Sequence, residues 1–438
     1  MKMKFNYESI TDLLDEINSA GFELPVSYDL KILEQPVHLG GKTIPNALSI
    51  HPMEGCDGTK DGKPDKLTYR RYERMARGGA GLIWIEATAI VPEGRANPRQ
   101  LFLCRQNVEA FSRLYDLIIS TSQEEFGSDY RPYTVLQLTH SGRYSKPEGK
   151  PAPIIAAENP YLDKSSLHYR IITDDELKQL EDRFVEAAVL AQKIGFDAVD
   201  IKSCHRYLIS ELLSAHTRNG EYGGSFENRT RFLLNIVDKI KTRLGDSIDI
   251  AVRLNAYDAI PYPYGWGVDA EDDSKPDLAE PIKLVELLKE KGVKLINITC
   301  GNPYYNPHIG RPFDTGGYSS PEHPLMGVLR LLQTARDIQK SVPEVSIIAT
   351  GFSWLREFAA LIAAGGIEAG WFRIAGFGRQ AFAYPDFPKD ILLHGAMERR
   401  KCCIACSKCT EIMRRGGTTG CVIRDRGVYA PIYKSITT

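Results

Sequence analysis

Three polar side chains of different chemistry follow a short apolar run near the middle of the chain. The run Ala198–Ile201 has the length and composition of a buried parallel strand, and Lys202, His205 and Tyr207 come directly after it. An ammonium can polarise a carbonyl or hold a carboxylate, and a phenol, which is protonated at neutral pH, can act as a general acid. The sequence therefore predicts a catalytic cluster here. The alternative for Lys202 is that it only pairs with an acidic neighbour.

A second group of reactive side chains lies near the end of the chain. Cys403, Cys406 and Cys409 form a C-x₂-C-x₂-C motif, and Cys421 supplies a fourth thiol. Three close thiolates and a remote fourth are the pattern of a [4Fe–4S] cluster, whereas zinc is the alternative because four thiolates also form a closed tetrahedral site. We favour iron–sulfur because zinc sites more often use two separated C-x₂-C pairs. Cys402 is not expected to be a ligand.

The elements that position these residues are indicated by apolar segments that alternate with helical patterns. Such alternation favours parallel βαβ units, and eight of them predict an α/β fold, the (β/α)₈ TIM barrel. In this barrel the chemistry lies at the carboxyl ends of the strands. The eight predicted strands are Ala47–His51, Gly81–Glu86, Thr134–Leu138, Ala198–Lys202, Ile248–Leu254, Lys294–Thr299, Ser346–Thr350 and Trp371–Ala375.

The remaining segments suggest how the barrel is closed and extended. Thr173 and Glu176 form a capping box before a long amphipathic pattern, and Gly195 can end that helix in the left-handed conformation. Two long connections, 142–172 and 301–324, follow strand ends, so we expect them to wall a substrate pocket.

We expect two parts in the chain. The barrel domain covers residues 1–395, with an N-terminal packing extension over 1–35 that contains a short amphipathic helix. A cysteine-rich segment covers residues 396–438.

The segment around Lys202 resembles the old yellow enzyme family of flavin-dependent NADH:flavin oxidoreductases. The family pattern is His-x-x-His/Asn-x-Tyr-Leu, then a loop close to Asp-x-Tyr-Gly-Gly-Ser-x-x-Asn-Arg. This chain has His205, Tyr207 and Tyr222-Gly-Gly-Ser-Phe-Glu-Asn-Arg229, with Lys202 in place of the first histidine. The resemblance implies that Lys202 and His205 donate to a substrate carbonyl and that Tyr207 protonates the α-carbon. The cysteine segment is similar to that of the trimethylamine dehydrogenase and 2,4-dienoyl-CoA reductase branch.

The resemblance also implies a bound flavin mononucleotide (FMN) and the residues that hold it. Gly351, Gly378 and Arg379 match the phosphate-binding positions after the last two strands. Gln137 and Arg253 match the residues on the pyrimidine side, where a fixed cation stabilises the negative charge of a reduced flavin. On pattern alone, Arg253 could instead belong to a buried structural ion pair.

The ring of the flavin is expected to lie against the ends of the first two strands. Pro52 and Met53 match segments that contact it, as does Ala87. At the position of Glu54 the family commonly has Cys or Thr, and the residue at this position affects the reduction potential of the flavin. Residues 376–381 also fit a dinucleotide fingerprint, but too little chain follows them to build a Rossmann unit.

Composition narrows the setting of the protein. The chain has 438 residues and a formal net charge of −1, which gives no electrostatic footprint for nucleic acid. It has no apolar run near the ~20 residues of a membrane span, and residues 1–24 are not a secretion signal. We expect a cytoplasmic enzyme that acts on a small molecule and forms a homo-oligomer.

These observations predict an FMN-dependent oxidoreductase, and specifically an ene-reductase in which Tyr207 donates the proton. The alternatives are an oxidative amine demethylase of the trimethylamine dehydrogenase type and a catalytically idle, flavin-carrying subunit. The larger relatives continue into nicotinamide-binding domains. For this chain we expect electrons to come either from NAD(P)H directly or from an external electron-transfer protein. The predicted cluster favours the electron-transfer protein.

Overall fold

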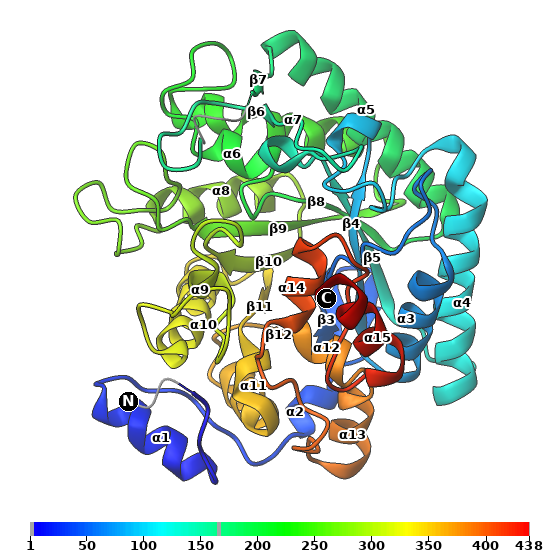
Figure 1. The fold of residues 1–438 in the computed structure, drawn as a ribbon, viewed down its shortest axis with the longest axis vertical. Helices are drawn as coiled ribbons and strands as arrows, with labels where there is room; N and C mark the ends of the chain where they lie inside the picture. The colour runs from blue at the N-terminus through cyan, green and yellow to red at the C-terminus, as the bar shows by residue number, and fades with distance from the viewer. Residues whose placement is uncertain (1–3, 164–167, 438) are drawn as a thin grey trace.

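Eight parallel strands close into a barrel at the centre of the molecule (Figure 1). The computed structural model describes residues 4–163 and 168–437. The predicted TIM barrel is confirmed, because each strand pairs with its neighbour in parallel and the last, β12, pairs with the first, β3. In barrel order the strands are β3 (Leu48–Ile50), β4 (Leu82–Ala89), β5 (Tyr133–Thr139), β8 (Ala198–Ile201), β9 (Asp249–Tyr257), β10 (Leu295–Cys300), β11 (Ser346–Ala349) and β12 (Ile374–Phe377).

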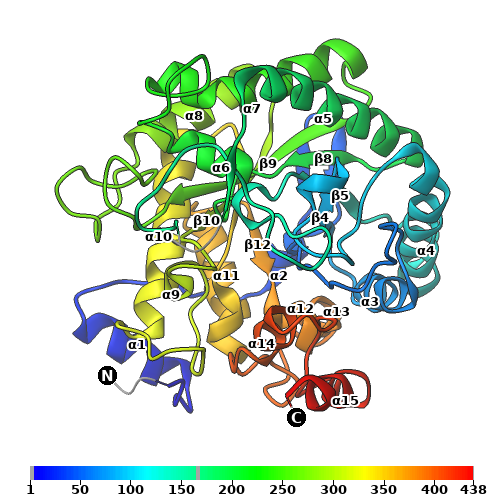
Figure 2. The same ribbon diagram turned by 45° about the horizontal axis from the view of Figure 1, so that its top comes forward.

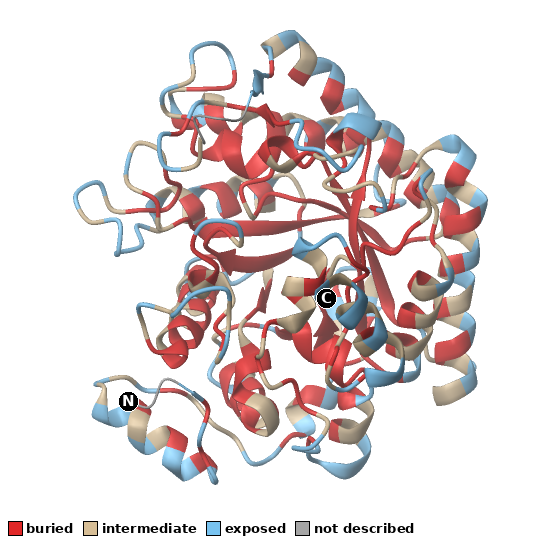
Figure 3. Cartoon of the chain, viewed as in Figure 1, coloured by how far each residue is buried: buried red, intermediate tan, exposed pale blue. Residues whose placement is uncertain are grey.

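Helices surround this barrel and connect its strands. Their inner faces are apolar, and Figure 3 shows buried residues concentrated on the strands and on the helix faces toward them. The predicted helix with the capping box is α5 (Asp174–Ile194), where Thr173 accepts from the Glu176 amide and Gly195 has φ +111°. The other large helices of the barrel are α3 (Lys66–Arg77), α4 (Val108–Phe126), α7 (Phe226–Leu244), α8 (Ala279–Glu290), α10 (Pro324–Ser341) and α11 (Ala359–Glu368).

Two local predictions differ from the structure. The last strand was expected at Trp371–Ala375 but begins at Ile374, because Gly370 has φ +70° and the Trp371 amide still caps α11 through the Gly366 carbonyl at 2.8 Å. The alternating residues and Gly40-Gly41 predict a hairpin over Leu33–Ile44. The observed hairpin is shorter: it consists of β1 (Val37–Leu39) and β2 (Lys42–Ile44), and Leu33 belongs to α2 (Lys31–Glu34).

The two long connections contain short elements of their own. The first carries the 3₁₀ turn Gly142–Tyr144 and the parallel pair β6 (Ile154–Ile155) and β7 (Arg170–Ile171), while its residues 164–167 lie outside the described residues. The second carries α9 (Pro307–Gly310). Both connections lie over the carboxyl end of the barrel, together with α6 (Leu208–Leu213).

The two ends of the chain pack on the barrel from outside. The N-terminal extension contains α1 (Ile10–Ser19), and Phe5 packs edge-on against Trp354 at 5.3 Å between ring centroids. After α12 (Arg379–Ala383) and α13 (Phe387–His394), the C-terminal segment forms α14 (Lys408–Arg414) and α15 (Arg426–Thr437), which lie beside α12 in both views (Figures 1 and 2). The division of the chain at residue 395 stays a prediction.

None of the helices in residues 4–163 and 168–437 has the length and hydropathy needed to cross a membrane.

The cap of α5 gives a direct test of this fold. Replacing Thr173 with Ala removes the side-chain oxygen that accepts from the Glu176 amide, and we expect a loss of about 1 kcal/mol in the free energy of unfolding. Urea denaturation of the folded protein measures it. Ser120→Ala, at an exposed position within α4, is the matched control and should cause no loss. Equal midpoints for T173A and S120A would contradict the assignment.

Candidate functional site

A cavity of about 190 Å³, called here the inner cavity, lies at the carboxyl end of the barrel. Its position agrees with the rule that barrel enzymes place their sites at the ends of the strands. Residues from several strand ends, from the 301–324 connection and from the C-terminal segment share its wall. All three predicted catalytic residues line it, and so do seven of the predicted flavin-binding residues: Pro52, Met53, Glu54, Arg253, Gly351, Gly378 and Arg379.

Two predicted flavin-binding residues do not line the inner cavity. The Gln137 amide donates to Asp200 Oδ2 at 2.6 Å, beside Trp84 Nε1 at 3.0 Å, so Gln137 lies among the buried side chains of the strands. The Ala87 carbonyl accepts from Gln100 at 3.1 Å. Burial raises the pKa of Asp200 to about 6.

Arg253 is a buried cation that the inner cavity leaves without an anion. Its backbone amide donates to Asp200 Oδ1, but no carboxylate of the described residues lies within ion-pair distance of its guanidinium, and Nε has no hydrogen-bond partner among them. Burial lowers the pKa of Arg253, since charge is disfavoured away from water. The structural ion pair considered for Arg253 is therefore not what the geometry shows.

A second basic region of the inner cavity is formed by Arg379 and Arg311. Arg379 donates from Nη2 to the Pro312 carbonyl at 2.6 Å, and its Nη1 has no partner among the described residues. Arg311 lies near it, and burial together with Arg379 lowers the pKa of Arg311 to about 10. Gly351, with φ +111°, and Gly378 complete this wall. Two buried guanidinium groups beside glycine backbone fit a phosphate.

Glu54 contacts two of the three predicted catalytic residues. The Tyr207 hydroxyl donates to Glu54 Oε1 at 3.1 Å, and Lys202 Nζ lies 3.8 Å from the same oxygen. Lys202 Nζ also lies 3.7 Å from the centroid of the Tyr207 ring. Lys202 therefore has an acidic neighbour, as the alternative interpretation of the sequence expects, and it also lines the inner cavity.

Burial fixes the protonation states of this cluster. It raises the pKa of Tyr207 well above its ordinary value, and the Glu54 carboxylate raises it further. It lowers the pKa of His205 well below its ordinary value, with Arg253 and Lys202 adding to the effect. Burial also lowers the pKa of Lys202, which Glu54 opposes. At neutral pH Tyr207 is a proton donor and His205 a neutral imidazole.

A strained turn aims His205 and Tyr207 at the inner cavity. His205 and Arg206 have φ of +64° and +59°, a conformation that costs on the order of 1–2 kcal/mol per residue. The Arg206 guanidinium is buried, bonds to Ser214, and pairs with Asp258 Oδ2 at 2.9 Å. Because Asp258 directly follows β9, this ion pair ties the turn to the neighbouring strand and offsets its strain.

The four predicted metal-binding cysteines surround one small cavity, of about 20 Å³, called here the cysteine cavity. Ala405 and Ser407 have φ of +51° and +56° and turn the chain around it. Cys409, Arg379 and Phe382 line both this cavity and the inner cavity, so the two adjoin. Within the described part of the chain, no set of three or more His, Cys, Asp or Glu side chains is placed to hold a single metal ion. The unassigned Cys402 does not line the cysteine cavity.

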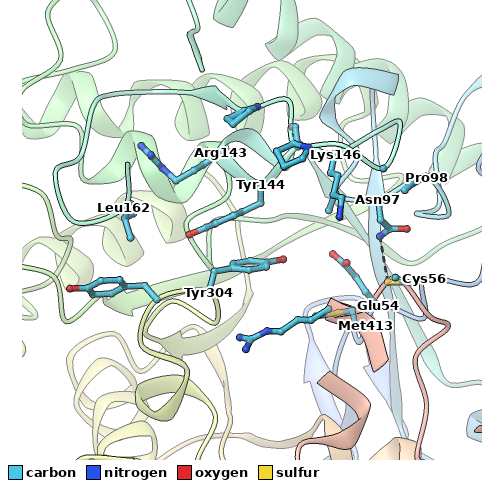
Figure 4. A pocket seen from close by; sticks show the side chains of 18 of the residues that line it. Glu54, Cys56, Asn97, Pro98, Arg143, Tyr144, Lys146, Leu162, Tyr304 and Met413 are labelled. Carbon is cyan, nitrogen blue, oxygen red and sulfur yellow. Dashed lines mark hydrogen bonds between the residues drawn. The ribbon is translucent and has the colours of Figure 1, made fainter. Parts of the chain in front are cut away.

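A larger opening of about 860 Å³, the outer groove, leads to the inner cavity (Figure 4). Glu54, Tyr304, Met413 and Arg414 line both spaces. The 142–172 connection contributes Tyr144 and the 301–324 connection contributes Tyr304, whose rings stack with centroids 3.8 Å apart. Both connections thus wall the site, as predicted.

Sequence reasoning did not single out three residues of this site. His51 directly follows β3, and its Nδ1 lies 3.0 Å from Asn297 Nδ2. Arg311 and Tyr304 come from the 301–324 connection. The length of the 301–324 connection and its tyrosines were the features of the sequence that could have indicated these site residues. Nothing in the local sequence of Arg311 distinguishes it from a surface arginine, because only the fold brings it beside Arg379.

Comparison with known proteins identifies the family. Residues 33–392 match the NADH:flavin oxidoreductase / NADH oxidase family. The chain belongs to this family. It is therefore an FMN-dependent oxidoreductase of the old yellow enzyme type. Arg253 Nε and Arg379 Nη1, which have no hydrogen-bond partner among the described residues, fit its anionic cofactor.

Individual relatives agree with this family assignment. The chain is 32% identical over 273 residues to an NADPH dehydrogenase of Bacillus pumilus, covering 61% of this chain and 73% of the relative. It is 28% identical over 413 residues to an NADH oxidase of Thermoanaerobacter brockii, covering 90% of this chain and 56% of that one. A solved 2-naphthoyl-CoA reductase has the same fold, with a TM-score of 0.74 at 21% identity, over 92% of this chain and 58% of its own. The chain thus spans little more than half of the last two proteins.

The buried His140 makes stability depend on pH. It directly follows β5, its Nδ1 accepts from the Gly142 amide at 3.0 Å, and burial lowers its pKa from 6.5 to about 4. As the pH falls, His140 of the unfolded chain becomes protonated before His140 of the folded protein. The free energy of unfolding therefore falls between about pH 6.5 and about pH 4, and His140 alone accounts for about 3 kcal/mol of this loss. Urea denaturation across this range measures the slope. His140→Asn should flatten it, and an unchanged slope would contradict the prediction.

Proposed function

We propose that the protein reduces an activated carbon–carbon double bond, with hydride from reduced FMN and a proton from Tyr207. The observation that supports this most is that Lys202, His205 and Tyr207 line the same inner cavity as the basic groups that suit the flavin. FMN bound here would supply hydride. The chain's own residues bind it, orient the substrate and provide the proton.

The basic groups divide the work of holding the flavin. Arg379 and Arg311, with Gly351 and Gly378, would hold the phosphate by charge-assisted hydrogen bonds. Arg253 would lie on the pyrimidine side, where a fixed positive charge favours the reduced, anionic form.

The catalytic cluster is suited to polarise a carbonyl and then protonate carbon. Lys202 and a neutral His205 both carry N–H groups that can donate to a carbonyl oxygen, which draws electron density from a conjugated alkene. Tyr207 keeps its proton at neutral pH and can deliver it to the α-carbon.

Charge in the inner cavity favours this reaction over oxidation of an amine. Five cationic side chains line it, namely Lys202, Arg253, Arg311, Arg379 and Arg414, against the single carboxylate of Glu54. The flavin would neutralise Arg253, Arg311 and Arg379, but Lys202, beside Tyr207, would still repel a substrate ammonium and attract a carbonyl or carboxylate.

We also propose that Cys403, Cys406, Cys409 and Cys421 hold a [4Fe–4S] cluster. All four residues line one small cavity, which agrees with the spacing of their thiols in the sequence. The shared residue Cys409 would put the cluster next to the flavin, so that electrons from a protein donor could enter there. NAD(P)H, which the family uses, is the other electron source. The cytoplasmic location and the homo-oligomer stay predictions from the sequence.

Replacing the proposed proton donor tests the reaction. Tyr207→Phe removes the hydroxyl but keeps the ring, and we expect enone turnover to fall about 10²–10⁴-fold because general acid catalysis is lost. Reduction of the flavin by NAD(P)H should keep its wild-type rate, which is the internal control. Steady-state and stopped-flow absorbance measure the two steps. Wild-type protein that reduces no enone or enoate would refute the proposed reaction.

Metal content tests the cluster. Protein purified without oxygen should contain about four iron and four sulfide per chain and show broad visible absorbance that dithionite bleaches. Cys406→Ser should lower the iron content, whereas Cys402→Ser, which changes a buried thiol outside the cysteine cavity, should not. One equivalent of zinc with no iron would support the competing tetrahedral site.

A further inference from the structure

Two tyrosines connect the outer groove to the buried end of Tyr207. The hydroxyls of Tyr207 and Tyr304 lie 3.1 Å apart, and their rings stack at 6.4 Å with an angle of 23°. Tyr207 is 2% exposed, whereas Tyr304 is 40% exposed and lines both the inner cavity and the outer groove. A proton that leaves Tyr207 must be replaced through a neighbour, because Tyr207 itself has almost no contact with solvent.

The hydrogen-bond pattern sets the direction of this contact. An ionised carboxylate only accepts, and a phenol has one hydrogen to donate. Because Tyr207 donates to Glu54 at 3.1 Å, the hydrogen between the two tyrosines must come from Tyr304. Tyr304 therefore directs its proton at the oxygen that would need one after catalysis.

The surrounding loop holds Tyr304 in this position. Its backbone amide donates to Asn302 Oδ1 at 2.9 Å, and Asn302 Nδ2 donates to the hydroxyl of Tyr144 at 2.7 Å. The Tyr144 ring stacks on Tyr304, as Figure 4 shows beside Glu54. Asn306 anchors the same loop by donating to the Asp258 and Ala259 carbonyls, both at 2.9 Å. The relay residue is thus fixed from both sides.

We propose that Tyr304 reprotonates Tyr207 after each turnover and takes its own proton from water in the outer groove. This inference rests on the proposed function. Reduced FMN, when bound here, would supply the hydride for the β-carbon. The Tyr207 O–H bond then breaks as its proton goes to the α-carbon. The resulting phenolate takes the proton of Tyr304, and Tyr304 regains one from water. Lys202, 3.7 Å from the Tyr207 ring, stabilises the phenolate in the interval, and the negative charge of Glu54 favours its reprotonation by Tyr304.

The test separates the first proton transfer from its replacement. FMN-loaded wild type, Tyr304→Phe and Tyr305→Phe are reduced without oxygen and mixed with a limiting amount of an enone that the wild type reduces. Tyr305 is the matched control, because it neighbours Tyr304 on the outer groove and its ring is 44% exposed. Stopped-flow absorbance follows flavin reoxidation and, in the near ultraviolet, the phenolate of Tyr207.

We expect flavin reoxidation within about twofold of wild type in both variants, and phenolate decay slowed about tenfold or more in Y304F alone. A purely structural role would slow flavin reoxidation in Y304F by the same factor, and that result overturns the proposal. Phenolate that decays in Y304F as fast as in Y305F, or no phenolate in any of the three, also overturns it and points to Glu54 or direct protonation. If the wild-type flavin is not reoxidised by any enone or enoate, the proposed function fails instead.

Discussion

An excess of buried positive charge is the constraint on which this site depends. Lys202, Arg253, Arg311 and Arg379 gather around one cavity, and burying cations without anions is costly unless a ligand neutralises them. An anionic flavin mononucleotide meets that need at two points, with its phosphate at one end and the charge of its reduced ring at the other.

The catalytic cluster is held by interactions that lie outside the cavity. The turn at His205 and Arg206 is strained, and the buried pair between Arg206 and Asp258 keeps it in place from the neighbouring strand. Glu54 then fixes the Tyr207 hydroxyl from the end of the first strand. The family resemblance suggested a redox-tuning position for Glu54, but its observed contacts are to the acid and the ammonium of the catalytic cluster. Under the proposed function, Glu54 would therefore act on the proton of Tyr207.

Much of the fold could be predicted from the pattern of residues. The strand positions follow from short apolar runs, and α5 follows from the Thr173 capping box and Gly195, because these are local effects of backbone hydrogen bonding and burial. The start of β12 was misplaced since Trp371 is apolar and its role in closing α11 depends on the preceding left-handed Gly370. The long connections could be located but not their internal elements, because β6 and β7 pair only across residues distant in sequence.

By itself, the sequence determined which residue types could do the chemistry and that eight strands would carry them: the cluster at Lys202, His205 and Tyr207, the cysteine spacing, and the glycines and arginines near the last strands. Only the tertiary structure decided which of them meet. It brought Arg311 beside Arg379, left Gln137 and Ala87 off the cavity wall, and placed Tyr304 against Tyr207. The physical reason is that parallel closure of the barrel brings all strand ends to one rim, while the loops that complete the site reach it through contacts with no local signature.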